Sequence, residues 1–279
     1  ACRTRQFWLL WLVLCLNVSA GIGILGMASP MLQEVFAGKL LGNDDSWRQL
    51  DALQLGHVAA IAAGFTGLLS LFNIGGRFFW ASLSDYLGRQ RTFALFFLLG
   101  ALLYFATTFV SNAGSITLFV LFFCIIISMY GGGFATIPAY LADLFGTQMV
   151  GAIHGRLLTA WSAAGILGPV LVNYLREYQL TMGIPQARIY DITLYVLAAL
   201  LSIGFLCNLM IRPVPEKYAM TEAQLQQAAS VYKRDPSQQL TWQASRTSYT
   251  WVALAWLIVG LPLLWGILIT LQQSARFFL

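Results

Sequence analysis

The chain has 279 residues, of which 58% are hydrophobic and only 10% are charged, with a mean hydropathy of +0.72. Soluble globular domains carry about 25% charged residues, so this composition excludes an ordinary soluble domain and indicates an integral membrane protein. The net charge of +5 does not indicate nucleic-acid binding, because the basic residues are distributed as in membrane proteins.

Seven apolar stretches are long enough to cross a bilayer as helices, which takes about 20 residues each. The first follows Arg3 and Arg5 as a signal peptide would, but its apolar run is too long and no small-residue cleavage site follows it. We therefore expect seven spans. They are Phe7–Leu32, His57–Leu83, Thr92–Val110, Ile116–Phe145, Val150–Leu175, Ile192–Ile211 and Thr250–Leu271.

The distribution of arginine and lysine indicates which end of each span faces the cytoplasm. With a cytoplasmic N-terminus, ten of the 16 basic residues fall on the cytoplasmic side, five fall outside, and Arg77 lies within a span. Cytoplasmic loops carry an excess of lysine and arginine. We therefore expect the N-terminus of this chain to be cytoplasmic.

The chain divides into three parts. Residues 1–211 contain six spans, residues 212–249 form a polar cytoplasmic linker, and residues 250–279 contain an additional helix and a tail. The linker contains Thr221-Glu222-Ala223-Gln224, a capping-box pattern that predicts a short helix extending to about residue 232.

Enzymes, metal proteins and seven-helix receptors are poor fits to this pattern. His57 and His154 lie near opposite membrane faces, no carboxylate pair faces inward, and Gly-x-Ser-x-Gly is absent. The last span lacks the lysine that a retinal protein requires, and a cytoplasmic N-terminus opposes a receptor. The four cysteines share no metal-ligand spacing; they are Cys2, Cys15, Cys124 and Cys207. We expect no cofactor and no metal site.

A charged turn lies between the second and third spans, in the segment ASLSDYLGRQR (residues 81–91). Asp85 ends one helix, Gly88 allows a tight reversal, and Arg89 begins the next helix. Arg89 can pair with an acid such as Asp143, at the cytoplasmic end of the fourth span. We expect such a pair to close the cytoplasmic side in one conformational state and to separate in another.

The spacing Asp85-x-x-Gly88-Arg89 resembles the loop motif of the major facilitator superfamily, which occurs once in each six-helix half, between its second and third helices. Ala81 stands in place of the motif's first glycine, and Gln90 in place of a basic residue. The resemblance implies an all-α integral membrane fold: one six-helix half plus one additional C-terminal transmembrane helix. Because a complete transporter has two halves, we expect a fragment whose N-terminal half lies on the same chain or on a partner.

Three further stretches resemble the carboxyl-terminal half of the oxalate/formate antiporter family: LWLVLCLNVSAGIGILGMASPMLQE, LFNIGGR and HGRLLTAWSAAGILGPVL. The resemblance covers residues 7–211. In that family the arginine four residues after the asparagine of the second stretch contributes to the anion site, which implies roles for Asn73 and Arg77. The oxalate exchanger also has a lysine in the fifth helix, where this chain has Trp161.

The chemistry of Arg77 leads to the same residue independently. A cation within the membrane costs several kcal/mol unless it is compensated, and a guanidinium forms paired hydrogen bonds with a carboxylate. The alternative is that the Arg77 side chain extends to the cytoplasmic interface. Asn73, one turn earlier, lies on the same face. Trp161, Tyr130 and Tyr140 are candidates to line the same cavity, with plain packing as the alternative for each.

The resemblance, together with the chemistry of Arg77, implies secondary active transport of small organic anions by alternating access, in a bacterial inner membrane. One cation favours a monocarboxylate such as formate, lactate or pyruvate over oxalate. Oxalate/formate exchange and a transporter-like sensor are the alternatives. No acid lies deep within a span, and Glu34, just past Pro30, is the nearest. This leaves anion exchange as an antiporter, or symport with a proton site elsewhere in the protein.

Overall fold

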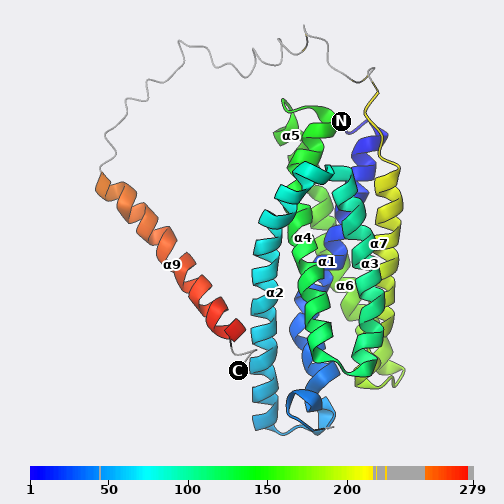
Figure 1. Ribbon diagram of the computed structural model, residues 1–279, viewed down its shortest axis with the longest axis vertical. Helices are drawn as coiled ribbons and strands as arrows, with labels where there is room; N and C mark the ends of the chain where they lie inside the picture. Colours follow the sequence, from blue (N-terminus) through cyan, green and yellow to red (C-terminus); the bar gives the residue numbers. More distant parts are fainter. Residues whose placement is uncertain (44, 216–217, 219–223, 225–248, 276–279) are drawn as a thin grey trace. The chain divides into compact units, whose positions relative to one another are not determined.

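The computed structural model describes residues 1–43, 45–215, 218, 224 and 249–275, and every regular element among them is helical. Seven helical segments are long and apolar enough to cross a membrane, which confirms the seven predicted spans. The helices are shown in Figure 1 and comprise α1 (Arg5–Leu40), α2 (Ala52–Leu87), α3 (Arg89–Ala113), α4 (Ile116–Phe145), α5 (Val150–Leu157), α6 (Thr159–Thr181), α7 (Asp191–Leu209) and α9 (Tyr249–Ala275).

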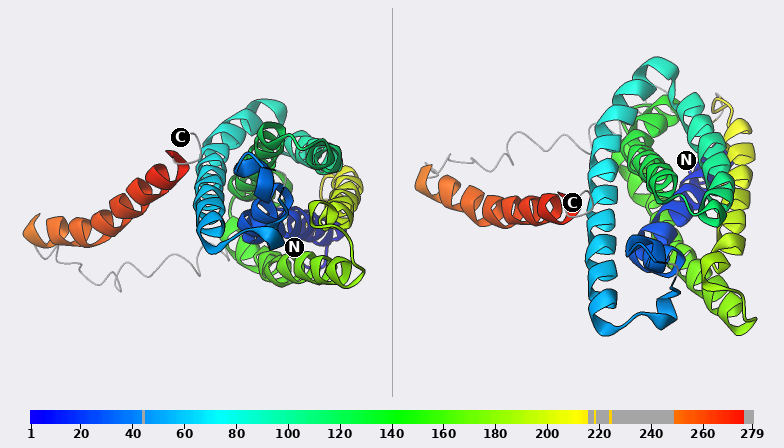
Figure 2. Two further views of the ribbon diagram at one scale, coloured as in Figure 1. Left: turned by 90° about the horizontal axis from the view of Figure 1, so that it is seen from below. Right: turned by 60° about the horizontal axis from the view of Figure 1, so that its bottom comes forward.

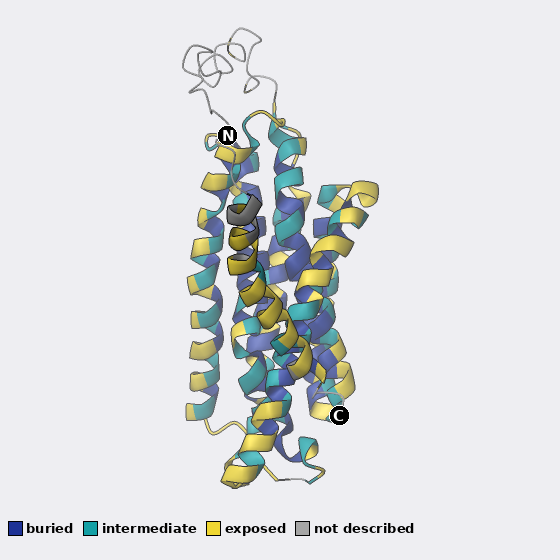
Figure 3. Cartoon of the chain, turned by 90° about the vertical axis from the view of Figure 1, so that its left-hand side faces the viewer, coloured by how far each residue is buried: buried dark blue, intermediate teal, exposed yellow. Residues whose placement is uncertain are grey.

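Residues Ala1–Pro213 belong to one compact unit, and Val214–Ile269 form a second. In the first unit α1 lies centrally, with α2, α4, α6 and α7 packed against it (Figure 2). Buried residues lie mainly on the helix faces that point inward (Figure 3). The predicted linker helix, which begins at the capping box of Thr221, lies outside the described residues apart from Gln224.

We call the first unit, which contains six of the seven spans, the six-helix unit. Its two ends carry different connections. The α2–α3 end carries the N-terminus and the turn at Gly88, and is uppermost in Figure 1. The α1–α2 end carries the connection from Leu41 to Asp51. The turns at Gly88 and Gly114 have φ angles of 86° and 72°, in the region that glycine adopts without strain. Glycine therefore permits α3 and α4 to follow their predecessors through very short connections.

The first two helices are longer than the predicted spans because capping groups, rather than the ends of the apolar stretches, set their limits. Each has 36 residues, or about 54 Å, against a hydrocarbon thickness of about 30 Å. The Thr4 hydroxyl accepts a hydrogen bond from the Phe7 amide, and the Asp51 carboxylate accepts one from the Gln54 amide. Both helices therefore extend beyond the apolar core of the membrane.

The fifth predicted span, Val150–Leu175, is divided into two helices that meet at Leu158. The Thr159 hydroxyl donates to the Arg156 carbonyl at 2.8 Å, and the Trp161 amide donates to the Leu158 carbonyl at 3.0 Å. Such short-range bonds distort a helix locally. The predicted span is confirmed as one apolar segment, Val150–Thr181, with a local irregularity at Leu158.

The closest helix contact in the unit joins α2 to α4 through glycine. A Cβ at Gly76 would overlap the carbonyl of Ser128, and a Cβ at Gly131 would overlap the carbonyl of Asn73. Trp80 packs over Gly132 and donates from its indole nitrogen to the Ser128 hydroxyl at 3.1 Å. Small residues permit this backbone approach in membranes, so the glycines determine where the two helices meet.

We expect Gly76→Ala to destabilise the unit and Gly75→Ala to leave it unchanged or slightly more stable. The two glycines are neighbours in α2, but only a Cβ at Gly76 meets backbone atoms, while a Cβ at Gly75 meets nothing within 4 Å. Overpacking costs about 1–3 kcal/mol. Thermal unfolding of the purified variants in detergent measures the difference, and equal melting temperatures would show that the contact does not limit stability.

Candidate functional site

Arg77 lies over an aromatic ring on the exposed surface of the six-helix unit. Its guanidinium carbon lies 5.4 Å from the ring centroid of Phe134 in α4. The Phe134 ring is 4.7 Å from Trp161 in α6, and Trp161 is 6.2 Å from Tyr130. We call Tyr130, Phe134 and Trp161 the aromatic group. Three helices thus bring one cation and three aromatic side chains together.

The Arg77 guanidinium has no carboxylate partner among the residues that the structure describes. Arg77 lies eight residues before Asp85, or about 12 Å along the helix. A cation over an aromatic face gains about 0.5–2 kcal/mol, which is less than the cost of placing it in a membrane. The aromatic contact therefore leaves the guanidinium's capacity for paired hydrogen bonds with an anion unused within the described structure.

Asn73 lies one turn from Arg77, against α4. Its side chain is buried, and its amide oxygen lies 3.0 Å from where a Cβ of Gly131 would be. No hydrogen bond joins the Asn73 side-chain amide to any other described residue. The absence of a side chain at Gly131 therefore leaves the room that Asn73 occupies.

Tyr130 and Tyr140 occupy different places in the unit. Tyr130 belongs to the aromatic group and is close enough to Arg77 for an electrostatic interaction. The Tyr140 hydroxyl instead donates to the Asn208 side chain at 3.1 Å, and its ring packs against Phe93 of α3. Tyr140 thus joins α4 to α3 and α7, and we leave it out of the anion site proposed below.

Phe134 is the member of the aromatic group that the sequence reasoning did not include. It lies four residues after Tyr130 in α4, so the two side chains share a helix face. The spacing is visible in the sequence, at the end of the Gly131–Gly133 run. It could have been recognised by asking which residue faces the same way as Tyr130.

The structure brings three residues of the charged turn together with Asp143 of α4 at the α2–α3 end. Arg89 pairs with Asp85 and donates to the Ser84 hydroxyl, and its Nε lies 4.0 Å from an Asp143 carboxylate oxygen. We call Asp85, Gly88, Arg89 and Asp143 the loop cluster. Arg89 is 17% exposed, whereas the two carboxylates are 62% and 63% exposed. Exposed pairs are worth about 0–1 kcal/mol, so the longer contact with Asp143 can separate at little cost.

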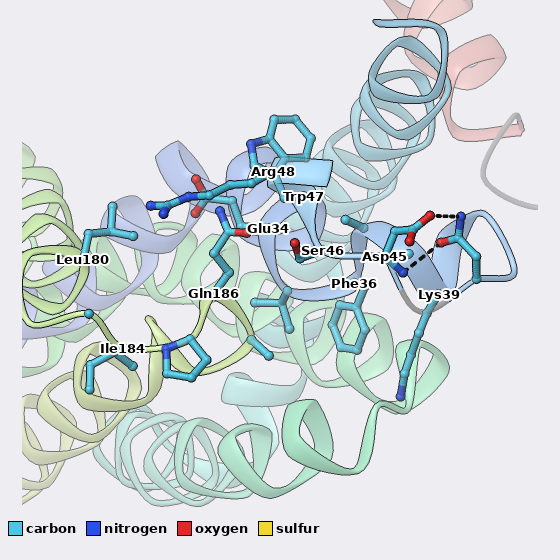
Figure 4. A pocket seen from close by; sticks show the side chains of 17 residues that line it. Glu34, Phe36, Lys39, Asp45, Ser46, Trp47, Arg48, Leu180, Ile184 and Gln186 are labelled. Atoms are coloured by element: carbon cyan, nitrogen blue, oxygen red, sulfur yellow. Dashed lines mark hydrogen bonds between the residues drawn. The ribbon is translucent and has the colours of Figure 1, made fainter. Parts of the chain in front are cut away.

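A second charged cluster, at the α1–α2 end, was not expected from the sequence. Glu34 of α1 pairs with Arg176 of α6 and accepts a hydrogen bond from the Tyr190 hydroxyl. We call these three residues the Glu34 cluster. It borders a pocket of about 490 Å³ between the end of α1, the following connection, and the connection from α6 to α7 (Figure 4). The sequence showed Glu34 as an acid near a span but did not indicate its partners.

The pocket itself has mixed charge. Glu34 and Asp45 contribute carboxylates to its lining, and Lys39 and Arg48 contribute cations. Asp45 is hydrogen-bonded to Asn43 (Figure 4). Among the described residues no group of three or more histidine, cysteine, aspartate or glutamate side chains can hold a metal ion. The pocket therefore offers no evident preference for a cation or an anion.

Comparison with known proteins identifies the family. The family model of the Major Facilitator Superfamily matches residues 10–277. The chain is also similar to the oxalate:formate antiporter of Oxalobacter formigenes, with 28% identity over 170 residues. The match covers 60% of this chain but only 35% of that relative, so the chain spans about a third of its length. The chain is a multi-pass membrane protein that belongs to the major facilitator superfamily, a family of transporters rather than enzymes.

Proposed function

We propose that this chain forms one half of a secondary transporter for small organic anions, with a monocarboxylate such as formate, lactate or pyruvate as its substrate. The observation that carries the proposal is the position of Arg77: a guanidinium with no carboxylate partner among the described residues, placed over the Phe134 ring within a membrane-spanning helix. The transporter works by alternating access in a bacterial inner membrane, with the N-terminus of this chain in the cytoplasm.

The chemistry of this position favours an anion. A carboxylate accepts two parallel hydrogen bonds from a guanidinium, and the Asn73 amide, one turn away, can donate another. The bound anion offsets the cost of keeping Arg77 charged within the membrane. The aromatic group then contacts the apolar part of the substrate, which a methyl-bearing acid such as lactate or pyruvate has and formate lacks.

A second half is needed to cover this face. Arg77 and several large apolar residues beside it, among them Ile74 and Phe78, are exposed on the six-helix unit. A charged residue of a membrane helix faces a bundle interior or a water-filled cavity rather than lipid. We therefore place the missing six-helix half, on the same chain or on a partner, against this face, with the substrate between the halves.

Charge favours a monocarboxylate over oxalate. Oxalate carries two negative charges, and Arg77 is the one cation beside the aromatic group in the described structure. Trp161, half-buried against Phe134, occupies the position where the oxalate exchanger is expected to have a lysine. The similarity to an oxalate:formate antiporter supports the second candidate, exchange of oxalate for formate, for which the other half would have to supply the second cation. A sensor that binds the anion without moving it is the remaining alternative.

We expect Arg77→Gln to reduce anion uptake by about 10-fold or more, because a hydrogen bond to a charged group contributes about 1.5–3 kcal/mol. Uptake by Arg77→Lys should fall between that of the unaltered protein and that of Arg77→Gln, since lysine keeps the charge but not the paired geometry. The measurement is uptake of labelled formate, lactate, pyruvate and oxalate into vesicles that contain equal amounts of each variant. Arg212→Gln, an exposed arginine beyond α7, is the control.

Full uptake by Arg77→Gln would remove Arg77 from the anion site. Binding of an anion without any flux in the unaltered protein would favour the sensor over the transporter.

Trp161→Lys should raise the preference for oxalate relative to lactate, because it adds a second cation beside the aromatic group. Trp161→Phe keeps the apolar contact and should keep the preference for the monocarboxylate. The ratio of the oxalate and lactate concentrations that halve labelled-substrate uptake measures the change. An unchanged ratio in Trp161→Lys would show that this position does not contribute to substrate choice.

Asp85→Asn should slow transport without preventing membrane insertion. It removes one of the two acids that pair with Arg89, and so changes the balance between conformations that are open and closed at the α2–α3 end. Asp143→Asn should act in the same direction. The measurement is uptake normalised to the amount of protein in the membrane, and normal uptake by both variants would rule out a role for the loop cluster.

A further inference from the structure

Helices α1 and α6 contact each other at three levels along their length. Near the α2–α3 end, the Trp11 indole nitrogen donates to the Thr159 hydroxyl at 2.9 Å. In the middle, a Cβ at Gly23 would lie 3.1 Å from the carbonyl of Gly168. At the α1–α2 end, the Glu34 cluster joins them. The first contact is exposed and the second is a close backbone approach, whereas the third is an ion pair between buried Glu34 and half-buried Arg176.

Within the Glu34 cluster, three hydrogen-bond donors contact the Glu34 carboxylate. Two guanidinium nitrogens of Arg176 bond to separate oxygens of Glu34, and the Nε contact measures 3.0 Å. The Tyr190 hydroxyl of the segment before α7 donates to the same carboxylate at 2.6 Å and lies 3.1 Å from Arg176 Nε. Glu34 is 8% exposed and is the only buried acid among the described residues. Paired geometry of this kind restricts orientation as well as distance.

Each partner lies beyond a proline. Pro30 in α1 comes four residues before Glu34, and Pro169 in α6 comes seven residues before Arg176. Proline removes a backbone hydrogen bond and permits a helix to bend. Without a connection beyond these prolines, the last turns of α1 and α6 could bend independently. The Glu34 cluster supplies an ion pair and a hydrogen bond at this level.

A buried ion pair is weak evidence for net stability, because desolvation cancels much of the attraction, but it specifies one geometry. The glycine contact between Gly23 and Gly168 already holds the middle of the two helices together. A role in positioning therefore accounts for the buried pair better than a role in stability alone.

We propose that the Glu34 cluster joins the segments of α1 and α6 beyond Pro30 and Pro169 into one moving part at the α1–α2 end of the transporter. Glu34, Arg176 and Tyr190 are positioning residues in the transport cycle and do not touch the substrate. This proposal rests on the transport function proposed above. The cluster is the counterpart, at the opposite end, of the loop cluster at the α2–α3 end.

The test compares Glu34→Gln, Arg176→Gln and the charge-swapped double variant Glu34→Arg/Arg176→Glu. Glu177→Gln is the matched control, because Glu177 also pairs with Arg176, at 2.6 Å, but is 67% exposed. Substrate binding, transport rate and the amount of protein in the membrane are measured for each. A cysteine at the half-buried Ser29, in a background without the four native cysteines, reports opening of this end through its rate of reaction with a maleimide.

Each single variant should lower the transport rate by about 10-fold, the order of one lost hydrogen bond to a charged group. It should also change the labelling rate at residue 29 while anion binding stays nearly constant. The charge swap should restore much of the rate, and Glu177→Gln should behave as the unaltered protein. Normal transport by both single variants, or loss of protein from the membrane without rescue by the swap, would overturn the proposal.

The two proposals can fail separately. Arg77→Gln tests the anion site through binding, which the cluster variants should leave intact. The labelling rate at residue 29 requires no substrate, so it reports on the cluster even if the transported anion is not a monocarboxylate.

Discussion

The contact between α2 and α4 is the constraint on which the candidate site depends. Gly76 and Gly131 allow the two backbones to approach until side-chain carbons no longer fit between them. This approach determines the register of α2 against α4, and the register places Arg77 over Phe134. In the membrane there is no hydrophobic driving force between helices, so close packing of this kind must supply the association. A small displacement of α2 would separate the cation from the aromatic group.

Each of the three consecutive glycines in α4 lies against a different side chain. Asn73 lies against Gly131, Trp80 against Gly132, and Asn17 of α1 against Gly133. The side-chain oxygen of Asn17 is buried and has no hydrogen-bond partner in the described structure. One short segment therefore joins α1, α2 and α4, and it does so with polar as well as apolar side chains. The centre of the unit is held by contacts that a larger residue at any of the three positions would disturb.

Sequence reasoning predicted those features that depend on length, polarity and short-range spacing. The length of the apolar stretches was enough to predict the seven spans. Counting the spans was enough to expect Arg89 and Asp143 at the same end of the unit, where they lie 4.0 Å apart. It did not predict contacts between distant helices, such as Glu34 with Arg176, which are 142 residues apart. No periodicity within one helix encodes which residue of another helix it will meet.

The direction of side chains around a helix explains the remaining differences. Successive residues turn by about 100°, so Phe134 lies about 40° from Tyr130 whereas Tyr140 lies about 80° from it on the other side. Proximity in sequence to the glycine run therefore did not place Tyr140 beside Arg77, and the structure joins it to Asn208 instead. The irregularity at Leu158, where the Trp161 amide donates to the Leu158 carbonyl, likewise leaves no mark in the hydrophobicity of the span.

Helix α2 runs for 36 residues and contains no proline, unlike α1, α4 and α6. Its two ends therefore lie about 54 Å apart along one uninterrupted helix, with the Gly88 turn and the loop cluster at one of them. Arg77 is eleven residues from Gly88 and Ala52 is 36 residues away, so a rotation of α2 moves its far end about three times as far as Arg77. By geometry alone, a small rotation of α2 about the Gly88 turn that shifts Arg77 would displace the Ala52 end of the helix by a larger distance.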